Sequence, residues 1–191
     1  MTVGVGSRAV KSPENQRIIF AVQAEGLLRG LDPDVTGKLK TRLKEAGLDP
    51  DVALPPGWPA ERLKVWLDIA SAEIYPDFPI DEAHRRIGRR FLDGWQRTML
   101  GAASAQFLKV LGMKRTLERL TRAFRTGDNF SETSVDFPSE RVGVVTIRSQ
   151  LLPHYIAGIL DGGLALMKVK GKVSIEPAAG DTMTFRVEWE P

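Results

Sequence analysis

Two histidines, His84 and His154, are the side chains of this 191-residue chain best suited to proton transfer near neutral pH. An imidazole becomes a catalytic base only beside a nucleophile and an orienting acid, and a metal site needs two or three further ligands. The sequence contains no HxxxH, HExxH or GxSxG motif and no paired-carboxylate motif that would supply such partners. We therefore predict that both histidines are structural, and that the chain has no catalytic site, no metal and no cofactor.

The residues around each histidine favour this interpretation. His154 follows Pro153 in the first turn of an expected helix, away from its apolar stripe, where an exposed side chain is typical. His84 lies at the edge of an apolar helix face, beside Ala83 and Ile87, where we expect a buried, hydrogen-bonded ring.

Composition excludes several further classes of site. The chain has no cysteine, which rules out disulfides, thiolate metal sites and cysteine nucleophiles and is typical of the reducing cytoplasm, where we expect this protein. The first residues, MTVGVGSRAVKS, lack the continuous apolar segment of a signal peptide. Uncharged runs end after about a dozen residues, short of the roughly 20 that a membrane helix requires. We therefore expect no membrane span.

Positive charge is concentrated in the middle of the chain. Between residues 81 and 126, eleven lysines and arginines outnumber four acidic residues, which gives +7 and leaves −4 for the rest of a chain whose total is +3. Such a segment attracts acidic partners or nucleic acid, but no aromatic residues alternate with the arginines to stack on bases, so nucleic acid is the weaker expectation. The candidate face for a protein partner consists of Arg85, Arg86, Arg89, Arg90 and Arg97.

The first two thirds of the chain are predicted to be mainly helical. Residues 1–15 are small and polar without periodicity, and we expect them to be disordered. From about residue 24 to 127, apolar residues recur at helical spacing in several segments. The longest such run extends from Ile80 to Leu111, and we expect Gly94 to kink it because an unbroken helix of about 30 residues is long for a globular protein. MKRTLERLTRAFRTG follows as another predicted helix.

From about residue 128 to 191 the pattern changes to the alternation of half-buried strands. NFSETSVDF, RVGVVTIRS, KVSIEP and TMTFRVEW are expected strands, and the turn AAGD joins the last two as an antiparallel hairpin. Between the two pairs lies a helix in which Gly158, Gly162 and Ala165 form a narrow seam that a neighbouring backbone can approach closely. The sequence predicts one α+β domain over residues 16–191: a helical bulk packed on a small antiparallel sheet, with a C-terminal strand-strand-helix-strand-strand unit.

Several of these segments together resemble an uncharacterised family of proteins described as restricted to myxobacteria, with many paralogues. The matching stretches include AEGLLRGL, YPDFPIDEAHRRIGRRFLDGW, LERLTRAFRTGDNFSE, HYIAGILDGGL and DTMTFRVEW, and they cover about residues 18–190. No activity is established for that family, so the resemblance implies a fold more than a function.

The second half also resembles, more distantly, the ligand-binding fold of vinyl-4-reductase-type sensor domains, transport-particle subunits of the Bet3 type and haem nitric-oxide-binding domains. This resemblance implies an apolar cavity between helices and sheet, and often a dimer. Haem-binding relatives pair a proximal histidine with a Tyr-x-Ser-x-Arg run, whereas neither tyrosine here, Tyr75 or Tyr155, begins such a run. We therefore do not expect haem.

These observations favour a non-catalytic, sensor-like binding domain that holds a small apolar ligand, such as an acyl chain. The candidate ligand-binding residues are Trp66, Phe91, Trp95, Met99, Phe107 and Ile159, because bulky apolar residues on facing helices line a cavity as readily as they fill one. The alternative is a homodimeric protein–protein interaction module in signalling or scaffolding. An enzyme ranks below both, since no spacing brings Glu73, Asp77, His84, Tyr155 and Asp161 together.

Overall fold

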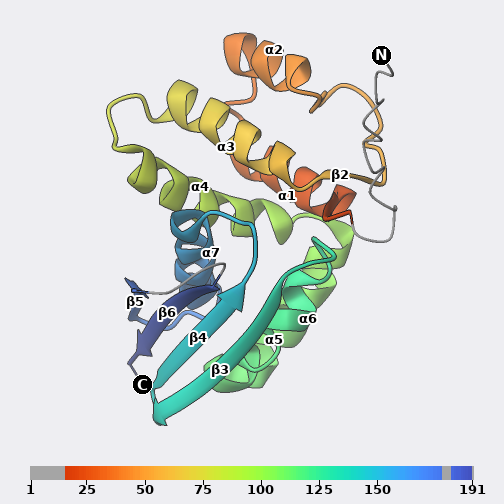
Figure 1. Ribbon diagram of the computed structural model, residues 1–191. Coiled ribbons are helices and arrows are strands. Elements are labelled where there is room, and N and C mark those ends of the chain that lie inside the picture. Colours follow the sequence, from red (N-terminus) through yellow and green to blue (C-terminus); the bar gives the residue numbers. More distant parts are fainter. Residues whose placement is uncertain (1–15, 178–181, 191) are drawn as a thin grey trace, which may run out of the picture.

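The computed structural model describes residues 16–177 and 182–190 (Figure 1). Its helices are α1 (Ala21–Leu31), α2 (Gly37–Glu45), α3 (Glu61–Ile74), α4 (Ile80–Trp95), α5 (Met99–Leu117), α6 (Leu120–Phe124) and α7 (Pro153–Leu166). Its strands are β1 (Ile18–Phe20), β2 (Gly57–Pro59), β3 (Glu132–Ser139), β4 (Val142–Arg148), β5 (Gly171–Glu176) and β6 (Thr182–Trp189). The predicted α+β class and the final strand-strand-helix-strand-strand order are confirmed. The N-terminus predicted to be disordered and the turn AAGD lie outside the described residues.

The main sheet has four strands in the order β3-β4-β6-β5, and all neighbouring strands are antiparallel. In the register, Val187 of β6 lies between Gly143 of β4 and Val173 of β5, so the three residues share one face. Val173 and Val187 are buried, and α5, α6 and α7 lie against the sheet, as Figure 1 shows. The helices therefore cover one face of the sheet, as the alternating strands predict.

Helix α4 runs between α1 and α7, and glycines allow its backbone to approach both. A Cβ atom added to Gly158 of α7 would collide with the Arg85 carbonyl oxygen and lie 2.9 Å from the Gly88 Cα atom of α4. On the other side, a Cβ added to Gly94 would lie 2.6 Å from the Cα atom of Gly30 in α1. Real Cβ atoms do not approach other atoms so closely, so both crossings depend on glycine. The predicted close-approach seam on α7 is confirmed at Gly158, but Ala165, also predicted to belong to it, is exposed.

Ion pairs reinforce the contact between α4 and α7. The Arg85 guanidinium donates two hydrogen bonds to the Asp161 carboxylate, from Nε at 2.7 Å and from Nη2 at 3.0 Å, and a third to the Val173 carbonyl oxygen. Arg89 donates two more to the same carboxylate, at 3.0 and 2.8 Å. Asp161 is therefore held by two forked donors, which orient it more firmly than single contacts would.

Arg90 connects α4 to the end of α1. Its guanidinium donates to the carbonyl oxygens of Gly30 and Leu31, both at 2.9 Å, and pairs with Asp34 at 2.7 Å. Carbonyl groups in the last turn of a helix have no partner within the helix, so a cation that binds them stabilises its end. Asp34 lies just before α2, whose N-cap position is occupied by Thr36.

The long run from Ile80 to Leu111 is two helices, and the predicted kink at Gly94 is wrong. Gly94 lies within α4, at the crossing with α1, and the chain leaves the helix at residues 96–98. Thr98 then starts α5, because its hydroxyl accepts a hydrogen bond from the Gly101 amide at 3.0 Å. A break does occur at Gly112, where a φ of 77° interrupts α5, and the segment that follows divides into the end of α5 and the short α6.

Both histidine rings lie beside carboxylates of the same chain, His84 on α4 and His154 on α7. The His84 Nε2 atom lies 3.1 Å from an Asp68 carboxylate oxygen of α3, and the residue is 5% exposed. His154 Nε2 lies 3.4 Å from the Asp81 carboxylate at the start of α4. Each contact joins two helices, as expected of structural residues.

The Gly158 seam predicts a marked difference between two glycine substitutions in α7. Gly158→Ala should destabilise the protein by about 3 kcal/mol or more, because backbone atoms on α4 cannot yield to the new methyl group. Gly163→Ala is the matched control: an added Cβ there has no atom within 4 Å, so we expect stabilisation of about 0.5–1 kcal/mol from the better helix former. Urea unfolding of both variants tests this, and equal effects would contradict the seam.

The burial of His84 leads us to expect that the folded protein loses stability in mild acid. Burial lowers the pKa of the His84 imidazole, and this effect outweighs the Asp68 carboxylate, which acts in the opposite direction. The unfolded chain therefore binds the proton more readily, so the free energy of unfolding decreases as pH drops below about 6.5. Urea midpoints measured from pH 7 to pH 5 should decline more steeply for the wild type than for His84→Gln. If the urea midpoints of wild type and His84→Gln declined equally with pH, the pKa of this imidazole would be the same in the folded and unfolded chain.

Candidate functional site: an apolar cavity and its mouth

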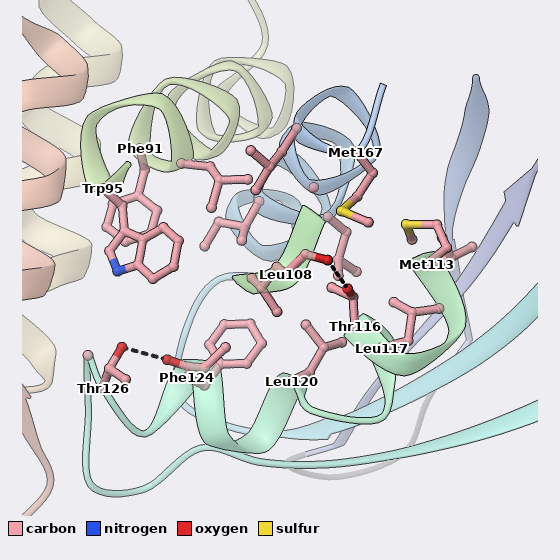
Figure 2. Close-up of a pocket in the computed structure, with 18 of the residues that line it drawn as sticks. Phe91, Trp95, Leu108, Met113, Thr116, Leu117, Leu120, Phe124, Thr126 and Met167 are labelled. Atoms are coloured by element: carbon pink, nitrogen blue, oxygen red, sulfur yellow. Dashed lines mark hydrogen bonds between the residues drawn. The ribbon is translucent and has the colours of Figure 1, made fainter. Parts of the chain in front are cut away.

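A cavity lies where α4, α5, α6 and α7 meet above the sheet. Figure 2 shows Phe91 and Trp95 of α4 on one side and Leu120 and Phe124 of α6 on another. The remaining walls are formed by α5, α7 and the residue after it, and by β6, through Leu108, Met113, Thr116, Leu117, Ile159, Leu160, Gly163, Leu166, Met167 and Val187.

The cavity is small and almost entirely apolar. Its volume is about 100 Å³, and among the described residues its lining includes no charged side chain. A cavity of about 150 Å³ with similar walls holds a benzene molecule, so this smaller space has room for only a short segment of a hydrocarbon chain.

Three polar side chains line the cavity: Gln23, Thr116 and Thr126. The threonine hydroxyls donate to carbonyl oxygens of their own segments, at 3.5 Å to Leu108 and 2.7 Å to Ala123. Gln23, only 4% exposed, is the third polar residue of this wall, and its side chain neighbours Tyr155.

Behind this wall lies a second polar group. The Tyr155 hydroxyl is fully buried, and no described residue reaches it with hydrogen-bond geometry. Burial raises the pKa of this phenol well above its usual value, and the neighbouring Gln23 side chain opposes the shift. The phenol therefore stays protonated, with its ring against Phe91 at a centroid distance of 5.6 Å.

A wider groove adjoins the cavity. It has a volume of about 410 Å³, and four residues line both spaces: Trp95, Leu108, Ala123 and Thr126. Its other walls come from Ala103, Ser104, Phe107, Arg119 and Arg122. The cavity thus has a mouth between α5 and α6, and the mouth carries two guanidinium groups.

The six apolar residues predicted from sequence to bind ligand lie in different surroundings. Phe91 and Ile159 line the cavity, Trp95 lines cavity and groove, and Phe107 lines the groove. Trp66 is fully buried elsewhere, where its ring packs edge-on against Trp58 at 5.3 Å and its indole donates to the Ala46 carbonyl oxygen. Met99 is 92% exposed.

The five arginines predicted to form a partner face all contact groups of their own chain: Arg85, Arg86, Arg89, Arg90 and Arg97. Arg86 pairs with Glu82 at 2.9 Å, and its guanidinium lies 4.0 Å from the centre of the Phe78 ring. Arg97 donates to the carbonyl oxygen of Arg29. The charge of α4 is therefore directed largely into helix–helix contacts.

Residues of α6 and of the end of α7 line the cavity but were not predicted from the sequence. Leu120 and Phe124 recur four residues apart, as do Ile159 and Gly163, and Leu166 follows three residues later. This spacing marks one side of each helix. The signal was present, but periodicity does not distinguish a side chain that lines a cavity from one that fills the core.

The described part of the chain offers no alternative inorganic site. Among residues 16–177 and 182–190, no group of three or more histidine, aspartate or glutamate side chains is arranged to hold a metal ion. Over the same ranges, no helix has both the length and the apolar character needed to cross a membrane.

Solved structures with a fold similar to that of this chain include H-NOX domains. One, reported in a study of the mechanism of H-NOX activation, is 13% identical with a TM-score of 0.69, and the match covers 91% of this chain and 97% of that one. An oxygen-binding H-NOX domain related to soluble guanylate cyclases, solved as its oxygen complex, is 16% identical with a TM-score of 0.60, covering 89% and 92%. A mutant H-NOX domain of T. Tengcongensis is 15% identical with a TM-score of 0.59, covering 88% and 96%. At these identities the likeness establishes the fold alone.

Comparison by sequence leads to a family without an assigned activity. No curated protein matches the chain. The model of the family described as "Protein of unknown function (DUF2378)" matches residues 17–190, which confirms the uncharacterised family expected from the sequence motifs. The chain therefore belongs to the DUF2378 family, on a fold that it shares with H-NOX domains.

Proposed function

We propose that this protein is a non-catalytic, sensor-like domain that binds a small apolar ligand in the cavity between α4, α5, α6 and α7. The observation that carries the proposal is the cavity itself, an apolar space of about 100 Å³ whose mouth opens between two helices. In this proposal residues 16–191 form one domain, supported by the single cluster of buried apolar side chains that extends from Ile19 to Val187.

Haem, the group studied in two of the similar H-NOX structures, does not fit this cavity. Haem iron in proteins takes an axial histidine, cysteine or tyrosine, or a methionine together with a histidine. No described lining residue is a histidine, cysteine or tyrosine, and both imidazoles are paired with carboxylates outside the cavity. The ligand we propose is therefore held by apolar contact and shape.

The walls of the cavity suggest how binding is transmitted. The residues of α5 that are buried are Gly101, Ala105, Met113 and Leu117, and two of them line the cavity. A ligand that contacts Met113 and Leu117 stabilises the observed position of α5 relative to α7. Because a ligand shifts a conformational equilibrium only through contacts that differ between states, this wall is where binding changes the surface of the protein.

A larger side chain at Gly163, which lines the cavity, would fill part of the cavity. Gly163 lies four residues after Ile159 and three before Leu166 on the lining side of α7, and an added Cβ there meets no atom within 4 Å. We expect Gly163→Leu to weaken binding of the uncharged fluorophore N-phenyl-1-naphthylamine by about tenfold or more, since losing one well-buried contact of about 1.4 kcal/mol has that effect. Fluorescence titration measures the affinity.

The matched control places the same side chain on the opposite, exposed side of that helix. Ala165→Leu should leave the fluorophore affinity unchanged, and thermal melting should show that neither variant is destabilised. Equal affinity of wild type and Gly163→Leu would refute the cavity as the binding site. Absence of fluorophore binding to the wild type would refute the proposed function.

A second function, homodimerisation through α5, is supported by a separate observation. Four large apolar side chains of this helix are exposed, Met99, Leu100, Phe107 and Val110, the first and last by 92% and 86%. Exposed apolar side chains gathered on one helix are typical of an interaction surface.

Sedimentation velocity at micromolar concentration distinguishes this alternative. If α5 forms the interface, the wild type sediments as a dimer and Val110→Lys as a monomer, because burial of an unpaired ammonium group at an interface is strongly unfavourable. Val65→Lys on α3, a residue 41% exposed, is the control and should remain dimeric. A wild type that is monomeric throughout would exclude the interface.

A further inference from the structure

We infer that the ligand is a single-chain amphiphile with an anionic head, whose tail extends from the groove into the cavity and whose head is bound by Arg119 and Arg122 in the groove. This inference rests on the proposed function and specifies the chemistry of its ligand. It follows from the shape of the two spaces and from the placement of charge between them.

The two connected spaces differ in width and polarity. The inner cavity is narrow and without charge, whereas the groove outside it is about four times larger, at 410 Å³ against 100 Å³, and contains both arginines. Trp95 and Leu108 line both spaces, so a chain passing from one to the other stays in apolar contact. A molecule with a thin hydrocarbon tail and a broader polar end matches this profile, whereas a rigid disc does not.

The charge of the groove is unbalanced. No described residue that lines it has a carboxylate, and neither Arg119 nor Arg122 forms an ion pair with any residue in 16–177 or 182–190. The arginines of α4, by contrast, are engaged by Asp161, Glu82, Asp34 and carbonyl groups. The two guanidinium groups at the mouth are thus available to an anion that enters the groove.

The position of Arg119 suits an anion at the boundary of apolar surface. Its guanidinium carbon lies 5.6 Å from the centre of the Phe107 ring, which orients the group while leaving its N–H donors to a ligand. Guanidinium groups bind carboxylate and phosphate oxygens with paired, charge-assisted hydrogen bonds. Both heads share this chemistry, and the experiment separates them.

Four probes with the same twelve-carbon tail isolate the contribution of the head: dodecanoate, methyl dodecanoate, dodecyl phosphate and dodecylamine. Each is used below its micellar concentration, as a competitor of N-phenyl-1-naphthylamine. We expect the wild type to bind dodecanoate or dodecyl phosphate at least about tenfold more tightly than the methyl ester, the factor expected of one charge-assisted hydrogen bond. Dodecylamine should bind no better than the ester, because its positively charged head is repelled by the two arginines of the groove.

The arginines are tested with a charge-matched pair of double variants. Arg119→Gln with Arg122→Gln should abolish the preference for the anion while leaving the affinity for the methyl ester unchanged. Lys109→Gln with Arg115→Gln removes the same charge from exposed positions of α5 that line neither space, and should retain the preference. This comparison separates direct contact with the head from a change in overall charge.

Each outcome bears on a different claim. Tighter binding of one anion than the other identifies the head as carboxylate or phosphate. Equal binding of anions and ester overturns the anionic head but leaves an apolar binding domain. A preference that survives in the Arg119 and Arg122 variant also overturns the inference, because it places the head elsewhere. If the fluorophore itself does not bind, the proposed function has failed together with the inference.

Discussion

The architecture depends on two crossings in which the backbone of α4 touches the backbones of α1 and α7. Gly94 makes the first crossing possible with Gly30, and Gly88 makes the second with Gly158. Helices that pack through ordinary side chains lie about 8–10 Å apart, and only a missing Cβ allows a closer approach. These contacts bring Arg85 and Asp161 to hydrogen-bond distance, so that charge pairing follows from backbone proximity.

The cavity is a consequence of that arrangement. With α4 and α7 fixed against each other, a space remains beside them and above Val187 of the sheet, and α5 and α6 form its other walls. These two segments are poorly suited to fill it completely, because α5 is interrupted at Gly112 and α6 has only five residues. Protein cores are normally packed without voids larger than a water molecule, so a persistent apolar space at a helix junction is a candidate site for a ligand.

Charge is divided between two uses in the same segment of chain. The arginines of α4 join helices: Arg90 binds the last carbonyl groups of α1, while Arg85 and Arg89 hold Asp161. The arginines of the α5–α6 junction, Arg119 and Arg122, instead face the groove at the cavity mouth. The net charge of the segment does not distinguish these two uses, although only the arginines that line the groove are placed to bind an anionic ligand there.

The sequence alone determined the α+β class, the order of the C-terminal strands and helix and the close approach at Gly158, because these follow from local periodicity and glycine placement. Only the tertiary structure decided which apolar residues border open space. Trp66 and Trp95 both belong to amphipathic helices, yet one fills the core and the other lines the cavity. Met99 continues the apolar spacing of α4 but is exposed, because the chain turns at residues 96–98 and α5 starts in a new direction. Periodicity reports which side of a helix is apolar, whereas packing between segments distant in sequence decides what that side meets.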